Sequence, residues 1–320
     1  MPLVDMSLEK LYQFQGLNER PADMEEYWDR AIAEMEALGT GCELIPAKFQ
    51  FPGVEAYDMY FTGVGGARIH CKLVRPAKRE GKIPAVCVFH GYSGNCGSFS
   101  GLLRWAAVGF VAAALDCRGQ AGLSEDSVAV KGNTLYGHII RGLDDPDPNK
   151  LYFRNVFLDT AQMARIVMAM DEVDETRVGA TGGSQGGGLT LACAALTPKL
   201  NRAAPIYPFL CDYRRVWEMD LDVAAYRELR EHFRHFDPRH EREQEIFTKL
   251  GYIDNQHLAH RIRAKIKMFT GLMDTVCPPS TQFAAYNKIT SEKSVVIYPD
   301  FGHEGLPESD DICLEYMLEM

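Results

Sequence analysis

The sequence has no run of apolar residues that approaches the length of about 18 needed to cross a membrane. It also lacks an N-terminal leader pattern. The opening residues, MPLVDMSLEKLYQF, include Asp5 and Glu9 and show no cationic segment followed by an apolar run. We therefore expect a soluble protein with no membrane partner.

Positive charge is scarce, since 34 Lys and Arg residues stand against 44 Asp and Glu residues, for a formal net charge of −10. Proteins that bind nucleic acid need clustered Lys and Arg to contact the phosphates. The charge balance therefore argues against a nucleic-acid partner and an anionic membrane surface. It is compatible with a neutral, small-molecule substrate.

No two cysteines form a CxxC pair, and their total of nine is odd. Several lie within apolar runs, such as Cys71 in IHCKLV, Cys87 in VCVF and Cys193 in LACAAL. This usage predicts buried free thiols rather than disulfides or metal ligands. A reducing, cytoplasmic location is the corresponding expectation.

Internal repeats and low-complexity tracts are absent, and the 320 residues, 46% of them hydrophobic, can bury a substantial core. Near the N-terminus, short alternating segments at 43–51, 56–62 and 67–75 predict antiparallel strands. Gly65 and Gly66 lie between the last two segments, which are therefore expected to form a hairpin.

From residue 83 onward, apolar strands alternate with helical segments. The expected strands are 83–89, 110–116, 177–182, 265–271 and 294–299, and the expected helices lie near 156–173, 185–196 and 279–289. Such alternation predicts an α/β fold, with a mostly parallel central sheet covered by helices on both faces. Residues 119–150 and 212–260 are expected to be insertions at the carboxyl edge of that sheet, within one domain that spans residues 1–320.

The most informative local pattern is Gly182-Gly183-Ser184-Gln185-Gly186, a G-x-S-x-G between an expected strand and an expected helix. In that context it predicts the nucleophile elbow of an α/β-hydrolase fold, where serine projects from a strained turn with small neighbours. The following helix directs its free N–H groups at the same place. The alternative, a phosphate-binding turn, lacks the lysine of a P-loop.

A serine hydroxyl needs a base to remove its proton. In this fold the acid and then the histidine follow the serine in chain order, and His303 in PDFGHEG comes just after the last expected strand. The other late histidines, His257 and His260, precede the last two strands. His303 and Glu304 begin an HExxH-like string, but no second histidine completes it, so no zinc site is expected.

The acid of the triad should orient the imidazole and stabilise its positive charge. Asp274 in GLMDTVCPP directly follows the strand expected at 265–271. Asp300 shares the loop of the histidine and would have to fold back awkwardly, while Asp254 lies too early in the chain. Asp274 is therefore the predicted acid, and an aspartate that only caps the next helix is the alternative.

Two hydrogen-bond donors should stabilise the oxyanion of the reaction, each worth roughly 100- to 1000-fold in rate. One is expected to be the backbone N–H of Gln185. The other is expected from HGYSGNCG at 90–97, where Gly91 permits a tight turn and Tyr92 supplies its backbone N–H. The alternative for Tyr92 is a purely packing aromatic.

Several motifs together resemble carbohydrate esterase family 7, the acetyl xylan esterases and cephalosporin-C deacetylases, over essentially the whole chain. These motifs are RGQ at 118–120, GGSQGG at 182–187, HE at 303–304, HGYSG at 90–94 and YPFLCDYRR at 207–215. The tripeptide Arg118, Gly119 and Gln120 is expected to have a structural role near the site, with Arg118 bridging backbone carbonyls and carboxylates.

The resemblance implies a cofactor-independent enzyme that removes acetyl groups from acetylated xylo-oligosaccharides and cephalosporin C. It implies Ser184, Asp274 and His303 as the triad, with Tyr92 and Gln185 at the oxyanion hole. It also implies a homohexamer, a trimer of dimers whose active sites open to an interior cavity that admits only small substrates.

A small acyl pocket is a hypothesis that rests on Tyr92, Pro208 and Phe209. Two other functions remain open at this point. One is a different α/β-hydrolase activity, such as that of a thioesterase or a peptidase. The other is a non-catalytic binding protein with the hydrolase fold, although such proteins have usually lost a member of the triad.

Overall fold

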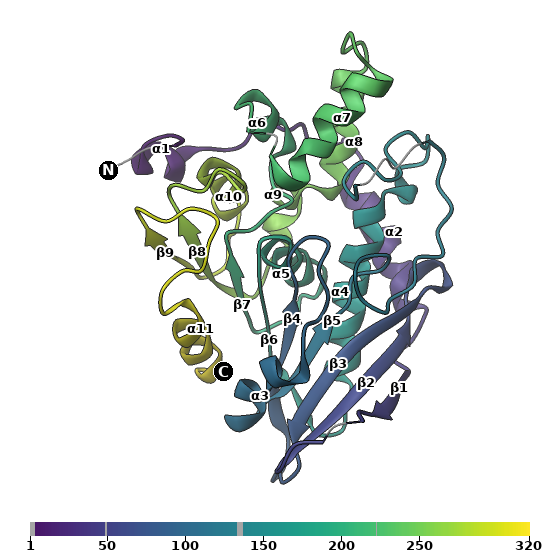
Figure 1. Ribbon diagram of the computed structural model, residues 1–320, viewed down its shortest axis with the longest axis vertical. Coiled ribbons are helices and arrows are strands. Elements are labelled where there is room, and N and C mark those ends of the chain that lie inside the picture. Colours follow the sequence, from purple (N-terminus) through teal and green to yellow (C-terminus); the bar gives the residue numbers. More distant parts are fainter. Residues whose placement is uncertain (1–3, 49, 133–136, 222) are drawn as a thin grey trace.

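One mixed sheet runs through the part of the chain that the computed structural model describes, residues 4–48, 50–132, 137–221 and 223–320 (Figure 1). The strands among these residues are β1 (Cys42–Pro46), β2 (Val54–Thr62), β3 (Arg68–Pro76), β4 (Ile83–Phe89), β5 (Val111–Leu115), β6 (Val173–Gly183), β7 (Arg202–Ile206), β8 (Lys265–Gly271) and β9 (Lys293–Tyr298). Their order across the sheet is β1-β2-β3-β5-β4-β6-β7-β8-β9.

The two parts of the sheet differ in strand direction. β1, β2 and β3 pair antiparallel, and β3 also runs antiparallel to β5. From β5 across to β9, neighbouring strands are parallel. Gly65 and Gly66 adopt φ angles of 75° and 77°, which allows the tight connection between β2 and β3. The predicted hairpin and the predicted parallel α/β sheet are both confirmed.

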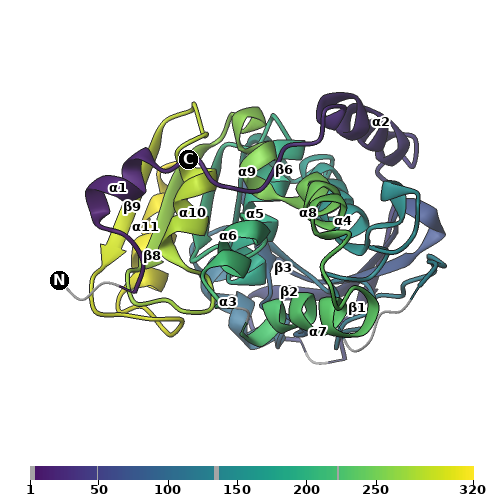
Figure 2. The same ribbon diagram turned by 90° about the horizontal axis from the view of Figure 1, so that it is seen from above.

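Helices cover both faces of this sheet (Figures 1 and 2). They are α1 (Leu8–Gln13), α2 (Met24–Glu36), α3 (Phe99–Ala107), α4 (Tyr152–Met168), α5 (Gln185–Leu196), α6 (Tyr213–Glu218), α7 (Arg227–Phe236), α8 (Glu243–Leu250), α9 (Asn255–Leu258), α10 (Pro279–Tyr286) and α11 (Ser309–Leu318). One apolar core includes Trp28, Phe157 and Leu189 from α2, α4 and α5. The second core includes Trp105 and Tyr316 from α3 and α11.

Strand β5 shows how one strand serves both cores. Val111, Ala113 and Leu115 belong to the first core, whereas Ala112 and Ala114 belong to the second. The split follows from strand geometry, because successive side chains point to opposite faces. An uninterrupted apolar strand is therefore buried on both sides, as a parallel sheet requires.

Some element boundaries differ from the prediction. The strand predicted at 43–51 ends at Pro46, and the helix predicted at 156–173 runs from residue 152 to 168. The sequence pattern misses α3 and β7 entirely. Gly101 lies inside α3 and Pro205 inside β7, and these residue types disfavour a helix and a strand interior, respectively.

The two predicted insertions lie between the expected elements. Residues 119–150 connect β5 to α4, and residues 212–260 connect β7 to β8. Each leaves the carboxyl end of a parallel strand, the edge at which α/β folds bind ligands. In Figure 1, α7 and α8 of the second insertion rise above the sheet.

Among the described residues, no helix has both the length and the apolar character needed to span a membrane. All nine cysteines are free, and all but Cys42 and Cys96 are buried.

Candidate active site

Ser184 lies at the sharp turn between β6 and α5. Its backbone has φ 59° and ψ −119°, a positive φ that non-glycine residues rarely adopt. Main-chain hydrogen bonds hold the turn: Ser184 N–H donates to Ile206 O, and Ser184 O accepts from the N–H groups of Gly188 and Phe209, all at 3.0 Å. This strand–turn–helix arrangement is the geometry of a nucleophile elbow.

The turn depends on the glycines around the serine. A Cβ atom on Gly182 would lie 2.5 Å from Phe89 O, and one on Gly186 would lie 2.2 Å from the same oxygen. A Cβ on Gly187 would lie 2.5 Å from Ile206 O. Because these neighbours are backbone atoms, no side-chain movement could relieve the contacts. The glycines therefore let β4 and β7 close on the turn.

His303 approaches the serine from the loop between β9 and α11. Its Nε2 lies 2.9 Å from Ser184 Oγ, and its Nδ1 lies 2.8 Å from Asp274 Oδ2. An ionised carboxylate can only accept, so Nδ1 carries a proton and Nε2 is free to take the proton of the serine. The imidazole is 22% exposed, so a substrate can reach it.

Asp274 is buried in the loop after β8. Its Oδ1 accepts the N–H groups of Val276 and Cys277, both at 2.8 Å, while Oδ2 faces the imidazole of His303. These bonds fix the carboxylate and thereby the orientation of the ring.

Neither rival carboxylate joins this arrangement. Asp300 is exposed in the loop that precedes the histidine. Asp254 is buried elsewhere and accepts the N–H groups of Asp212, at 2.9 Å, and Gln256, at 3.1 Å. The structure thus brings together the three residues that chain order selects.

A cysteine that no sequence pattern singles out also lies in the site. The ligand atoms of Cys277, Asp274 and His303 lie within 4.8 Å of one another. Burial raises the pKa of the Cys277 thiol well above its ordinary value, and the charge of Asp274 adds to the increase. The thiol therefore stays neutral and weakly nucleophilic, and the imidazole Nε2 faces the hydroxyl of Ser184 instead.

Tyr207 fills the space between the elbow and the imidazole. Its ring centroid lies 4.6 Å from that of His303, and a Cβ on Gly183 would lie 3.3 Å from the tyrosine ring. The backbone of Tyr207 is itself in a positive-φ conformation, at 31°. The residue follows β7, the strand that the sequence pattern misses. Tyr207 begins the motif YPFLCDYRR, but the motif assigns it no role beside the histidine.

Tyr92 belongs to the loop after β4, which passes over the elbow. The side-chain Nε2 of Gln185 lies 3.4 Å from both His90 O and Gly91 O of this loop. The hydroxyl of Tyr92 accepts the backbone N–H of His138 at 2.9 Å. The first insertion is thereby tied to the loop of the predicted oxyanion hole.

Pro208 and Phe209 lie next to the elbow and are buried. The ring of Phe209 packs between Tyr92 and Tyr226, with centroid distances of 5.7 Å and 4.4 Å. A Cβ on Gly187 would lie 2.9 Å from Pro208 Cα. The residues predicted to line the acyl pocket therefore form one wall beside the turn.

Arg118 is fully buried behind the site. Its Nε and Nη2 donate to the two carboxylate oxygens of Asp159, both at 2.7 Å, and its Nη1 donates to Val64 O at 3.0 Å. Gly119, which follows it, has a φ of 64°. The guanidinium thus bridges a carboxylate and a backbone carbonyl.

Gln120 links the same tripeptide to the elbow. Its Nε2 donates to Gln185 Oε1 at 2.8 Å, and Gln185 Nε2 donates back to Gln120 Oε1 at 3.1 Å. Tyr152 adds a contact, since its hydroxyl lies 3.0 Å from Gln120 Nε2. The side chain of Gln185 is therefore fixed from the loop after β5, which leaves its backbone N–H as the group that can serve a substrate.

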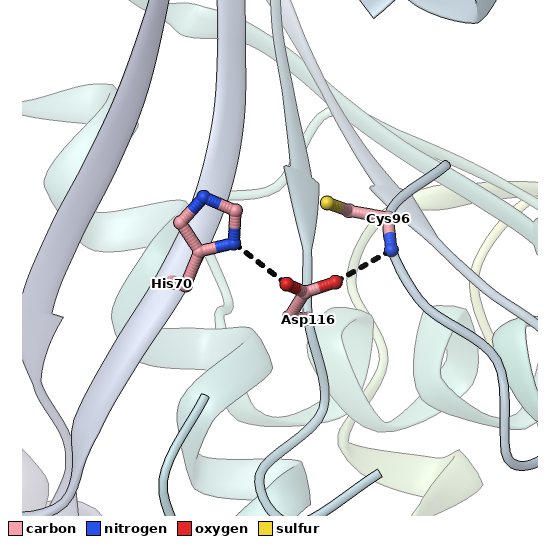
Figure 3. A group of neighbouring side chains, drawn as sticks. All are labelled: His70, Cys96 and Asp116. Carbon is pink, nitrogen blue, oxygen red and sulfur yellow. Dashed lines mark hydrogen bonds and ion pairs between the residues drawn. The ribbon is translucent and has the colours of Figure 1, made fainter. Parts of the chain in front are cut away.

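Two groups of side chains among the described residues are close enough to hold a metal ion. One consists of Asp274, Cys277 and His303. The other consists of His70, Cys96 and Asp116 (Figure 3). In both groups the imidazole is already bonded to the carboxylate, at 2.8 Å and 2.6 Å respectively, so a cation would have to displace a proton.

Comparisons with known proteins agree with the geometry. A family model described as acetyl xylan esterase (AXE1) matches residues 1–319. The chain is similar to the acetyl esterase Axe7A of Xylanibacter ruminicola, with 26% identity over 289 residues. That match covers 87% of this chain but only 62% of the relative's length.

Two solved structures are similar over nearly the full length. Acetyl xylan esterase 1 from Thermoanaerobacterium sp. JW/SL YS485 is 55% identical, with a TM-score of 0.96 and coverage of 98% of this chain and 99% of that chain. The acetyl xylan esterase from Paenibacillus sp. R4 is 35% identical, with a TM-score of 0.93 and the same coverage. The predicted α/β-hydrolase fold is confirmed by these matches.

Proposed function

The chain belongs to the acetyl xylan esterase family, whose members are carboxylic ester hydrolases, and on that premise we propose that it removes acetyl groups from acetylated xylo-oligosaccharides and related small acetyl esters such as cephalosporin C. The observation that carries the proposal is the continuous line of hydrogen bonds from Asp274 through His303 to Ser184. That line supplies a serine nucleophile with a base and an orienting acid.

The first half-reaction acylates the enzyme. His303 Nε2 takes the proton of Ser184 Oγ as the oxygen attacks the carbonyl carbon of the acetyl ester. The negative oxygen of the tetrahedral intermediate is stabilised by the backbone N–H groups of Tyr92 and Gln185. His303 then gives its proton to the sugar oxygen, the bond between that oxygen and the carbonyl carbon breaks, and the deacetylated sugar leaves.

The second half-reaction releases acetate. His303 removes a proton from water as the water oxygen attacks the acetyl-serine carbonyl, and the same two N–H groups hold the oxyanion. Collapse of this intermediate returns the proton from His303 to Ser184 Oγ. Asp274 stabilises the imidazolium in both halves. The two steps balance with water as the sole co-reactant.

The short acyl chain follows from the wall beside the elbow. Tyr92, Pro208 and Phe209 bring bulky groups close to the turn, and Phe209 is held between two aromatic rings. An acetyl group needs little depth, whereas each further methylene would have to displace packed side chains. We therefore assign acetyl specificity to this wall.

We propose in addition that residues 1–320 form one domain that works as a homohexamer, a trimer of dimers, in the cytoplasm. The support is the family resemblance together with the free cysteines, which suit a reducing compartment. In this arrangement the active sites face an interior cavity and receive small oligosaccharides. Light scattering tests the assembly, and a monomer would refute it.

A kinetic panel tests the proposed reaction. We expect turnover of acetylated xylo-oligosaccharide, cephalosporin C and p-nitrophenyl acetate, with kcat/KM falling steeply from acetyl to octanoyl esters. Ser184→Ala should abolish turnover while circular dichroism remains unchanged. Equal rates on octanoyl esters would refute the acetyl pocket. Preferred cleavage of thioesters or peptides, or undiminished turnover by the variant, would refute the esterase mechanism.

A further inference from the structure

A second histidine–aspartate pair lies outside the triad, where β3 passes the end of β5. His70 Nδ1 is 2.6 Å from Asp116 Oδ2, and His70 Nε2 is 2.9 Å from Asp58 Oδ1. The imidazole is 1% exposed and the Asp116 side chain 2%. A neutral imidazole has only one N–H group. Two carboxylates at hydrogen-bond distance therefore hold His70 as an imidazolium.

The surroundings of the imidazole favour the same charge state. Burial alone would lower the pKa of His70, but the hydrogen bonds and negative charges of Asp116 and Asp58 raise it above its ordinary value. Two other titratable groups face the ring. Tyr60 on β2 lies 4.9 Å away between ring centroids. Burial and the nearby Asp116 raise the pKa of the Cys96 thiol to about 12, so it is neutral.

Asp116 uses its remaining hydrogen-bonding capacity on two loops. Its Oδ1 accepts the N–H of Cys96 at 2.6 Å, and its Oδ2 accepts the N–H of Leu123 at 2.8 Å. Figure 3 shows His70 and Cys96 bonded to opposite oxygens of the carboxylate. The second loop wraps closely, since a Cβ on Gly122 would lie 2.1 Å from Asp116 Cγ.

These two loops supply residues of the candidate active site. The loop after β4 carries Tyr92 between residues 90 and 97, and the loop after β5 carries Gln120, which is paired with Gln185. The loops are also bonded to each other, because the N–H of Ala121 donates to Gly94 O at 3.2 Å. The carboxylate of Asp116 is thus a common anchor for both.

We propose that His70 is a positioning residue of the esterase, which keeps Asp116 in place and thereby sets the backbone N–H of Tyr92 at the distance that the oxyanion requires. The inference rests on the proposed function, because it assumes that this N–H acts in acyl transfer. Without the N–H that His70 Nδ1 directs at it, Asp116 would be a buried carboxylate that lacks one of its hydrogen-bond donors. Such a group turns toward water or takes up a proton, and either change releases the two loops.

The direction of the pH effect follows from the charge state. We call charged His70, with its bonds to Asp116 and Asp58, the clamp. Because the folded protein raises the pKa of His70, the clamp is present below that pKa and is lost as the pH rises through it. After deprotonation one ring nitrogen presents a lone pair to a carboxylate, and in the tautomer protonated at Nε2 that carboxylate is Asp116, which is then released. The proposal therefore expects kcat to decline at alkaline pH.

Two isosteric substitutions of His70 separate the roles of its nitrogens. The amide of His70→Asn occupies the place of Nδ1 and can still donate to Asp116, whereas that of His70→Gln occupies the place of Nε2 and reaches Asp58 instead. With p-nitrophenyl acetate we expect H70Q to lose about ten- to hundredfold in kcat with KM changed less than about threefold, because an oxyanion donor acts in the transition state. H70N should lose much less and should lack the alkaline decline.

Controls make the outcome decisive. His235→Gln alters an exposed histidine that is also paired with a carboxylate, and it should match the parent. Asp58→Asn offers an amide N–H to neutral His70, so it too should lose the alkaline decline, and it decides the matter if H70Q does not fold. Equal kcat in H70Q and the parent, or an unchanged alkaline decline in H70N and D58N, would overturn the proposal.

Failure of this inference can be told apart from failure of the proposed function. If Ser184→Ala abolishes turnover while H70Q keeps the parent's kcat, the esterase mechanism is supported and the positioning role of His70 is refuted. If Ser184→Ala retains turnover, the mechanism itself falls. The charge state of His70 can be measured by ¹⁵N nuclear magnetic resonance of the imidazoles. A signal that is absent from H70N should show two protonated nitrogens at every pH below the alkaline decline of kcat.

Discussion

Two histidine–aspartate pairs in this chain are built alike and differ in the partner of the second ring nitrogen. In each pair the histidine Nδ1 meets a buried aspartate that also accepts two backbone N–H groups. His303 Nε2 then faces the hydroxyl of Ser184, whereas His70 Nε2 faces the carboxylate of Asp58. The first imidazole is 22% exposed and the second 1%.

A histidine–aspartate pair is therefore not catalytic by itself. A hydroxyl at the second nitrogen gives the imidazole a proton to take, and exposure lets it pass that proton to a substrate. A carboxylate at the same position keeps the imidazole charged, so it can only hold its neighbours. The group that faces Nε2 and the exposure of the ring therefore determine whether the histidine acts as a base or as a clamp.

The largest effect should come from breaking the catalytic pair. Asp274→Asn replaces an acceptor opposite His303 Nδ1 by an amide, which favours the tautomer that cannot accept the serine proton. We expect kcat on p-nitrophenyl acetate to fall by about 10⁴-fold. Thermal unfolding provides the control, since a large loss of stability in D274N would mean that the effect is not chemical.

Breaking the pair of His70 and Asp116 should mainly reduce the stability of the fold. Asp116→Asn removes the charge opposite a buried imidazolium, and removing one partner of a buried pair costs about 3 kcal/mol or more in unfolding free energy. Asp58→Asn touches the same imidazole from a side chain that is 31% exposed, so we expect a loss below about 1 kcal/mol. Urea unfolding compares the two variants, and equal losses would contradict the ranking by burial.

Glu228 on α7 is a buried carboxylate whose hydrogen bonds come from backbone N–H groups rather than from an imidazole. It accepts the N–H of Ile139 at 2.7 Å. Burial raises its pKa to about 7 although backbone N–H groups oppose the increase. Burial acts on Asp116 in the same direction, yet the hydrogen bond from His70 and the backbone donors bring the pKa of Asp116 far below its ordinary value.

The most gradual effect is a pH dependence of stability at Glu228. A glutamate in the unfolded chain titrates near about 4.3, so stability from the neutral folded carboxyl is full below that pH and is lost as the pH rises through about 7. Glu228→Gln cannot ionise and should therefore gain on the parent between pH 5 and pH 8 in urea unfolding. The partly exposed neighbour Glu231→Gln should show no such trend, and parallel curves for E228Q and the parent would refute this account.

The fold and the triad could be predicted from the sequence because their signals lie in short segments or in the order of residues along the chain. Apolar strands, the glycines around Ser184 and the order of Asp274 and His303 can be read along one chain. The clamp could not be found in this way. His70 and Asp116 are 46 residues apart and meet only because β3 pairs antiparallel with β5, a choice that no pattern in either segment specifies.

The positions of Tyr207 and Glu228 could not be predicted for a related reason. Tyr207 follows β7, and the Pro205 within that short strand removes the pattern that would have revealed it. Glu228 looks like any charged residue of a solvated helix until the first insertion is folded against it. Contacts between segments that are distant in the chain, rather than local propensity, place these groups.

The positive φ of Ser184 has a consequence for the engineering of this protein. A non-glycine residue held in such a conformation costs on the order of 1–3 kcal/mol, whereas glycine adopts it without strain. A library of variants screened for heat resistance alone would therefore select glycine at this position, and the selected variants would lack the nucleophilic oxygen. Only a screen that scores catalysis in the survivors would keep the serine.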